Sequence, residues 1–180
     1  MERNIQGRDE ALQALIDKQE IRDLLMRYCR GIDRCDKELL RSVYHPDATD
    51  DHGFFKGSVS EFLDWIMADL VNKYRLTMHS ISNILIELEG DVAYGETYLH
   101  AYHRIKKEEI DKEYDLVAGG RYIDRFERRN GVWKIASRRC VYDWFRRDPC
   151  TERWSSQLRP DARGLRGPDD PVYHRLPPGS

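Results

Sequence analysis

The sequence has few cysteines and no long apolar run. No uninterrupted apolar stretch approaches the roughly 20 residues that span a bilayer, and the polar start, Met1-Glu2-Arg3-Asn4, has no apolar segment of a signal peptide. The cysteines show no Cys-x-x-Cys spacing, so we expect no disulfide: Cys29, Cys35, Cys140 and Cys150. We therefore expect a cytoplasmic protein with no membrane partner.

An excess of charge of one sign is also missing. The 30 Lys and Arg residues nearly balance 32 Asp and Glu residues, which leaves a net charge of -2. Such a chain has no long-range field to attract nucleic acid or an anionic membrane. The glycine-rich phosphate loops, the G-x-S-x-G elbow and the H-E-x-x-H zinc motif do not occur, so nucleotide, flavin and serine-hydrolase chemistry have no anchor.

The length of 180 residues fits one domain, and its first half has helical patterns. Apolar residues recur at spacings of three and four from Leu12 to Tyr28, which predicts a helix that packs on a core and breaks at Gly31. Asp36 can cap a short second helix, with Leu39, Leu40, Val43 and Tyr44 on its buried side, that ends at Pro46. Ser58-Val59-Ser60-Glu61 is a capping box that predicts a third helix.

After Tyr74 the apolar period changes to about two, which predicts strands. The predicted strand regions are 81–88 and 92–105 around Gly90-Asp91, then, after a charged loop at 106–113, 120–128 and 132–145 around Asn130-Gly131. Helices followed by an antiparallel meander indicate an α+β domain over residues 1–145, with helices on one face of a strongly curved antiparallel or mixed sheet. The proline-rich residues 146–180 predict an extended arm, with Trp154 and Tyr173 as possible anchors.

Asp33 and His79 are the most informative candidate site residues. The pattern places Asp33 in the loop between the first two helices and His79 near the start of a strand. A carboxylate that orients an imidazole makes a general base that works near neutral pH. The two side chains are expected to meet across one pocket.

Three motifs in this order resemble the SnoaL-like branch of the nuclear transport factor 2 (NTF2-like) superfamily: Tyr28-x-Arg30-Gly31-x-Asp33, His79-x-x-x-Asn83 and the hairpin over residues 119–135. The branch includes hexachlorocyclohexane dehydrochlorinase, scytalone dehydratase and bile-acid 7α-dehydratase, and the resemblance covers about residues 10–145. It implies an NTF2-like cone that encloses a pocket, chemistry without metal or cofactor, and a homotrimer.

The resemblance also implies roles for individual residues. His79 would be the base, Asp33 its orienting carboxylate, Arg138 the cation that neutralises developing charge, and Tyr28 a donor to a substrate oxygen. Strand alternation turns Arg139 to the other face. The remaining expected substrate contacts are Tyr44, His52, Asn83, His100, Tyr102 and Trp144, of which His100 is preferred over His103 as a second acid.

The expected function is a cofactor-independent lyase that removes water, halide or a small carbonyl fragment such as formaldehyde from a phenolic, polycyclic or alicyclic small molecule. An isomerase or cyclase with the same base is an alternative, as is a non-catalytic binding module or the small subunit of a ring-hydroxylating dioxygenase. The His45–His52 segment could ligate a divalent metal, but a helix-stopping proline followed by an acidic turn explains most of that composition.

Overall fold

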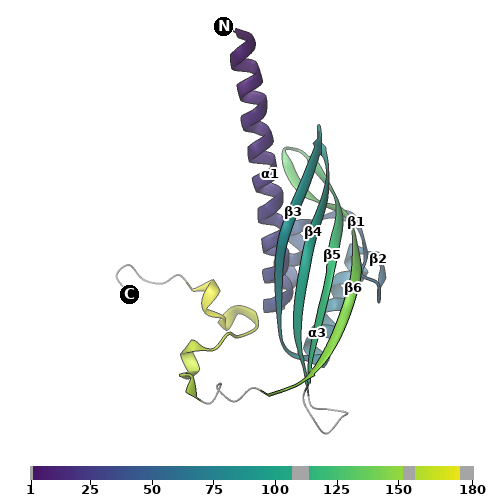
Figure 1. Cartoon of the computed structure of the whole chain (residues 1–180), viewed down its shortest axis with the longest axis vertical. Coiled ribbons are helices and arrows are strands. Elements are labelled where there is room, and N and C mark those ends of the chain that lie inside the picture. The colour runs from purple at the N-terminus through teal and green to yellow at the C-terminus, as the bar shows by residue number, and fades with distance from the viewer. Residues whose placement is uncertain (1, 107–113, 152–156, 175–180) are drawn as a thin grey trace.

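The computed structural model describes residues 2–106, 114–151 and 157–174 (Figure 1). Its helices are α1 (Glu2–Arg34), α2 (Lys37–Val43) and α3 (Val59–Lys73), and its strands are β1 (Tyr44–Asp51), β2 (Lys56–Ser58), β3 (Tyr74–Glu89), β4 (Val92–Ile105), β5 (Tyr114–Arg129) and β6 (Val132–Pro149). Of the predicted charged loop, residues 107–113 lie outside the described residues. Within the described ranges, no helix is both long and apolar enough to cross a membrane.

The strands form one sheet in the order β2-β1-β6-β5-β4-β3. Its neighbours pair antiparallel except for β1 and β6, which are parallel, so the sheet is mixed. The sheet is curved and open, and the helices lie against its concave side (Figure 1). The predicted α+β architecture is confirmed, and the curvature turns residues from both edges of the sheet toward the same interior.

The first helix differs from the prediction at both ends. It continues through Gly31 to Arg34, so Asp33 lies in the last helical turn rather than in a loop. Gly31 is needed because a Cβ there would lie 2.6 Å from Cγ of Leu40, which lets α1 and α2 approach closely. At the other end, Leu12 and Leu15 are exposed, and the N-terminal part of α1 projects beyond the sheet (Figure 1).

The starts of α2 and α3 were predicted correctly, whereas the first strand was missed. Asp36 accepts a hydrogen bond from the Leu39 backbone N–H at 2.9 Å, and the predicted capping box of Ser58 and Glu61 is present. The segment from Tyr44 to Asp51, predicted as a helix end and an acidic turn, is strand β1. An irregularity between Tyr44 and Thr49 in the β1–β6 pairing accommodates Pro46, which cannot donate to a ladder.

Tight turns and local register shifts set the pairing of the long strands. Asn130 and Gly131 both have positive φ, 53° and 77°, as the predicted tight turn between β5 and β6 requires. Asn83 also has a positive φ of 45°, and it sits where the β3–β4 register shifts by one residue. The bulge decides which side chains of β3 face the interior beyond that point.

The described part of the C-terminal arm lies on the helical end of the body. Arg166 donates to the backbone oxygens of Leu70 and Tyr74, both at 2.8 Å, where α3 passes into β3. Asp170 accepts from Arg34 at 2.9 Å, and the Tyr173 hydroxyl donates to Asp36 at 2.8 Å. Tyr173 is thus an anchor of the arm, whereas Trp154, the other predicted anchor, lies outside the described residues.

Candidate active site

A cavity between the concave face of the sheet and the helices contains the candidate catalytic groups. Its volume is about 80 Å³. Three histidines line it, His52, His79 and His103, together with aromatic side chains that include Tyr28, Tyr122, Tyr142, Phe54 and Phe145. The cavity therefore combines groups that transfer protons with an aromatic wall.

Asp33 and His79 meet as the sequence predicted. Nδ1 of His79 lies 2.7 Å from Oδ1 of Asp33, and the backbone N–H of His79 donates to Oδ2 at 2.9 Å. The Thr77 hydroxyl donates to Oδ1 at 3.0 Å. Because β3 is an edge strand, its free backbone N–H can bind a carboxylate from α1. With Nδ1 paired to Asp33, the lone pair of a neutral His79 is on Nε2, as a general base requires.

His103, rather than the predicted His100, is the β4 histidine in the cavity. Its ring centroid lies 5.2 Å from that of His79, at an interplanar angle of 87°. Burial, together with the neighbouring His79, lowers the pKa of His103 to about 3. His103 is therefore neutral near pH 7, and among the described residues its Nδ1 has no hydrogen-bond partner.

Tyr28 and Tyr122 form the deep wall of the cavity, with Arg138 packed between them. The Arg138 guanidinium carbon lies 4.0 Å from each ring centroid. Its Nε and Nη2 both donate to the Asp124 carboxylate at 2.8 Å, and the two side chains are fully buried. Arg138 thus faces the interior, as predicted, but it lies behind the tyrosines and does not itself line the cavity.

The hydroxyls of Tyr28 and Tyr122 are buried, and no partner is found for either within the described part of the chain. Burial raises the pKa of both hydroxyls well above the usual range, although Arg138 opposes the shift. Both groups therefore stay protonated and can donate hydrogen bonds to an oxygen of a bound molecule.

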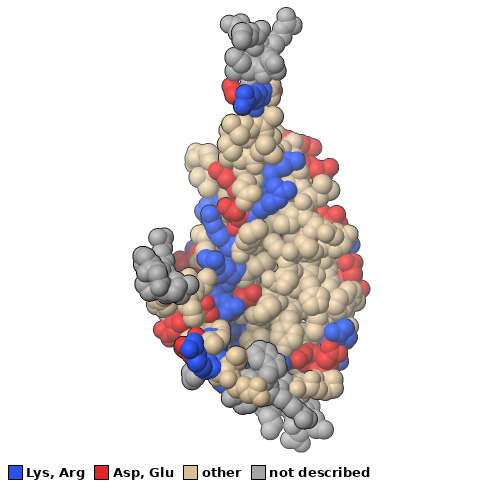
Figure 2. All heavy atoms as spheres, turned by 60° about the vertical axis from the view of Figure 1, so that its left-hand side comes forward, with Lys and Arg blue, Asp and Glu red and all other residues tan. Residues whose placement is uncertain are grey.

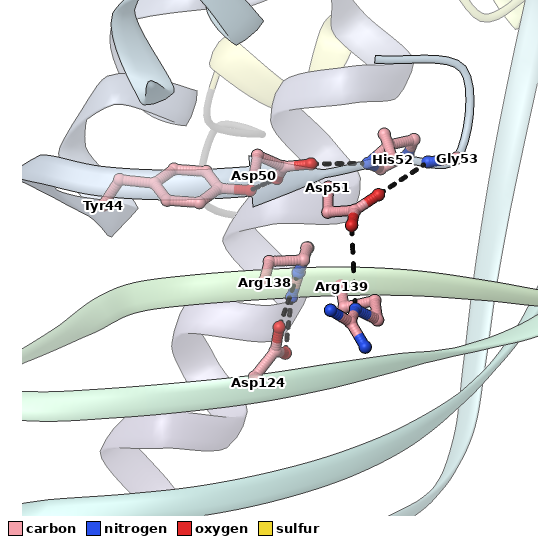
Figure 3. A network of polar contacts seen from close by, with 8 residues as sticks. All are labelled: Tyr44, Asp50, Asp51, His52, Gly53, Asp124, Arg138 and Arg139. Atoms are coloured by element: carbon pink, nitrogen blue, oxygen red, sulfur yellow. Dashed lines mark hydrogen bonds and ion pairs between the residues drawn. The ribbon is translucent and has the colours of Figure 1, made fainter. Parts of the chain in front are cut away.

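His52 belongs to a second carboxylate–imidazole pair (Figure 3). Its Nδ1 lies 3.0 Å from Oδ1 of Asp50, and the Tyr44 hydroxyl donates to Oδ2 of Asp50 at 2.7 Å. Tyr44, a predicted substrate contact, is thus buried behind Asp50 and does not line the cavity. His52 lines the cavity itself, which agrees with its predicted place.

Four other predicted substrate contacts lie outside this cavity. His100 is exposed on the outer face of the sheet, where its ring packs 5.9 Å from that of Trp144. Tyr102 is on the same face, and its hydroxyl donates to Asp115 at 2.7 Å. Asn83 is exposed at the bulge of β3. The structure therefore does not bring these four side chains to the cavity that His79 lines.

The cavity in this form is smaller than an aromatic ligand needs. A cavity of roughly 150 Å³ holds benzene, whereas this one measures about 80 Å³. Phe54 lines the cavity with 72% of its surface exposed, and its ring packs against Tyr142 and Phe145. Phe54 thus separates the interior from solvent, and its movement would enlarge the space.

No group of three or more His, Cys, Asp or Glu side chains in the described ranges is arranged to hold a metal ion. The predicted alternative, the acidic segment before His52, has other contacts: Asp47 accepts from Arg129 at 2.7 Å, and Asp51 lies 3.4 Å from Nζ of Lys56. The cysteines Cys29, Cys35, Cys140 and Cys150 are free thiols.

Sequence reasoning missed several residues of the site, namely Asp50, His103, Tyr122, Tyr142 and Phe54. The alternation of β5 could have suggested Tyr122, since Tyr122 and Asp124 share the parity of the buried Phe126. The Asp50–His52 pair had no such signal, because β1 was not recognised as a strand.

The sequence matches the SnoaL-like domain family over residues 13–139, so the chain belongs to this family. A search of curated proteins gave no match. Among solved structures, the chain is similar to a type 2 hexachlorocyclohexane dehydrochlorinase, with 20% identity, a TM-score of 0.69, and coverage of 94% of this chain and 99% of that one.

A second similar structure is a putative scytalone dehydratase from Novosphingobium aromaticivorans, with 21% identity, a TM-score of 0.65, and coverage of 78% of this chain and 96% of that one. A third is a type 3 hexachlorocyclohexane dehydrochlorinase from Novosphingobium barchaimii, with 20% identity, a TM-score of 0.68, and coverage of 79% and 96%. At these identities the likeness establishes the NTF2-like fold, and the chemistry has to be argued from the site.

Proposed function

We propose that this protein is a cofactor-independent lyase in which His79 removes a proton from a small-molecule substrate and a leaving group departs. The observation that carries the proposal is the Asp33–His79 pair, joined at 2.7 Å, of which His79 lies on the wall of the cavity. Asp33 holds the imidazole in one tautomer and stabilises the imidazolium that forms when Nε2 takes the proton.

The tyrosines of the deep wall complete the site. When a proton leaves carbon next to a carbonyl group, negative charge develops on the carbonyl oxygen, and fixed donors lower the energy of that state. Tyr28 and Tyr122 offer two such donors, both buried and without partners among the described residues. Arg138, packed at 4.0 Å against both rings, supplies positive charge behind them.

The substrate class follows from the wall and the size of the cavity. An aromatic lining suits a phenolic or alicyclic compound, and the small volume favours a compound with one ring, which the cavity would admit once Phe54 moves. Water, halide or a small carbonyl fragment such as formaldehyde would be the leaving group. These assignments fit the dehydrochlorinase and dehydratase names of two similar structures.

The test is a screen of aryl β-hydroxy ketones, aryl propanediols and chlorinated cyclohexanes with wild-type protein, His79→Ala and the control His100→Ala. His79→Ala should lose at least about 100-fold in turnover, whereas His100→Ala, altered on the exposed outer face, should react like wild type. Circular dichroism should show both variants folded. Activity should also survive exhaustive dialysis against a chelator. Full activity in His79→Ala would refute the proposal, and a product of unchanged mass would indicate the isomerase instead.

A further inference from the structure

We propose that His52 is a second catalytic residue of this cavity, held by Asp50 and Tyr44, and that it protonates the leaving group of the reaction begun by His79. The inference rests on the proposed function and deepens it. It assigns a role to a buried polar cluster that base catalysis by His79 leaves unexplained.

The geometry around His52 repeats that around His79. Asp50 uses Oδ1 to bind Nδ1 of His52 at 3.0 Å and Oδ2 to accept the Tyr44 hydroxyl at 2.7 Å (Figure 3). The Asp50 side chain is 0% exposed and that of His52 10% exposed. Since both carboxylate oxygens have fixed partners, the imidazole is held with Nε2 as the nitrogen that has no carboxylate partner.

The backbone fixes the direction of the His52 ring. His52 directly follows β1, and its N–H donates to the Phe55 carbonyl oxygen at 2.7 Å in a turn that Gly53 permits through its φ of 76°. The ring then packs between aromatic groups of the cavity, 5.1 Å from Phe62 and 6.3 Å from Tyr122 between ring centroids. The backbone turn and the packing of the ring thus fix the orientation of His52.

The sheet places the two histidines on opposite sides of the cavity. His52 follows β1 and His79 lies on β3, and β6, β5 and β4 stand between those strands in the sheet. Both residues nevertheless line the same cavity, because the sheet curves around it. A substrate held between them has one proton-transfer group on each side, which is what an elimination with a poor leaving group needs.

The proposed step is balanced for loss of water. Nε2 of His79 takes a proton from the carbon next to the carbonyl, and the electrons of that C–H bond form the C=C bond. The C–O bond to the hydroxyl group breaks, its electron pair stays on oxygen, and Nε2–H of protonated His52 supplies the proton that makes water. His79 ends as imidazolium and His52 as neutral imidazole, and exchange with solvent restores both.

The neighbouring carboxylate shows how a purely structural residue behaves at this turn. Asp51 accepts from the Gly53 N–H at 3.4 Å and lies 3.7 Å from the exposed Arg139 (Figure 3). The exposed Lys56 lies 3.4 Å from the same carboxylate. Asp51 turns outward, whereas Asp50 turns inward to an imidazole that lines the cavity. Asp51→Asn is therefore a matched control for Asp50→Asn. The matched control for His52→Gln is His45→Gln, because the ring of His45 binds the Glu127 carbonyl oxygen at 2.9 Å.

The experiment compares two probes that differ only in the leaving group: β-hydroxycyclohexanone and β-chlorocyclohexanone, both of which give cyclohexenone. Chloride departs without a proton, whereas hydroxide requires one. We expect His52→Gln to slow loss of water by at least about 100-fold and to change loss of chloride by less than about threefold. Asp50→Asn should also lower the rate of water loss relative to the rate of chloride loss. Both controls should leave the ratio of these two rates unchanged.

The outcomes separate this inference from the proposed function. Loss of both reactions in His79→Ala, with selective loss of dehydration in His52→Gln, supports both. If His79→Ala is inactive but folded His52→Gln keeps the wild-type rate ratio, the role of His52 is refuted and the lyase proposal stands. If wild-type protein accelerates neither probe above the uncatalysed rate, both fall together.

Discussion

Asp33 binds His79 twice, through the ring Nδ1 at 2.7 Å and through the backbone N–H at 2.9 Å. The last turn of α1 is therefore joined to the edge strand β3 by one carboxylate, which fixes both the position of the strand and the tautomer of the imidazole. Structure and chemistry depend on the same side chain, and a suitable substitution can separate them.

Asp33→Asn should lower kcat by roughly 10²- to 10⁴-fold with a smaller change in KM, because an amide keeps the shape but cannot stabilise imidazolium. The matched control is Asp23→Asn, which alters an exposed carboxylate of α1 that accepts from Gln19 at 2.9 Å and should leave kcat unchanged. Steady-state kinetics on any substrate found in the screen would measure both. An equal loss of binding and turnover would instead make Asp33 a substrate ligand.

The buried His103 should make stability fall in mild acid. Its pKa is lowered from 6.5 to about 3 in the folded state, chiefly by burial, so the unfolded state binds the proton first as pH falls. The contribution of the buried neutral imidazole to the free energy of unfolding is complete above pH 6.5. It is lost between pH 6.5 and about pH 3. The free energy of unfolding should drop by about 2 kcal/mol from pH 7 to pH 5 through this group.

Urea denaturation of wild-type protein and of His103→Leu at the two pH values would measure this contribution. From pH 7 to pH 5, the free energy of unfolding of His103→Leu should fall by about 2 kcal/mol less than that of wild type. His100→Leu, which alters an exposed histidine of the same strand, should keep the wild-type dependence. Identical pH dependence in all three proteins would contradict the prediction.

Gly31→Ala should destabilise the protein by about 1 to 3 kcal/mol, because the added methyl group would lie 2.6 Å from Cγ of the fully buried Leu40. Leu40→Val in the same chain should recover part of the loss. Gly7→Ala is the control: that glycine also lies in α1, and a Cβ there would meet nothing within 4 Å. Thermal unfolding would measure the melting temperature of each variant. Equal melting temperatures for Gly31→Ala and wild type would disprove the clash.

The protein should form a homo-oligomer, for which a trimer is the expected state, through the outer face of the sheet. This face exposes Met78, Leu85, Tyr98 and Trp144, and Figure 2 shows beside α1 a broad area without Lys, Arg, Asp or Glu. Exposed apolar side chains gathered on one uncharged face usually mark an interface.

Leu85→Glu should dissociate the oligomer, since it buries a charge in the contact. Leu12→Glu is matched in exposure, 56% against 57% for Leu85, but lies on α1 rather than on the sheet and should leave the oligomer intact. Light scattering at micromolar concentration would measure the mass of each protein, and a compact wild-type monomer would refute the assembly.

Local signals in the sequence were sufficient for much of the fold. The capping box at Ser58 and the turn at Asn130-Gly131 depend on neighbouring residues alone, so the start of α3 and the β5–β6 hairpin were predicted correctly. Strand β1 was missed because its pairing with β6 joins residues such as Asp50 and Arg138, which are far apart in the chain. No local pattern specifies such a pairing, and the Asp50–His52 pair was hidden with it.

The sequence by itself determined that Asp33 and His79 belong together, since their motifs carry the pairing, but the tertiary structure decided which other histidine joins them. The turn at Gly90 pairs Glu89 with Val92, and an unbroken ladder from there would set His79 opposite Tyr102. The bulge at Asn83 shifts the register by one residue, so His79 pairs with Ala101 instead. Because residues that pair across two strands share a face, this shift turns His79 into the cavity beside Ala101 and His103, whereas His100, which has the other parity in β4, faces solvent.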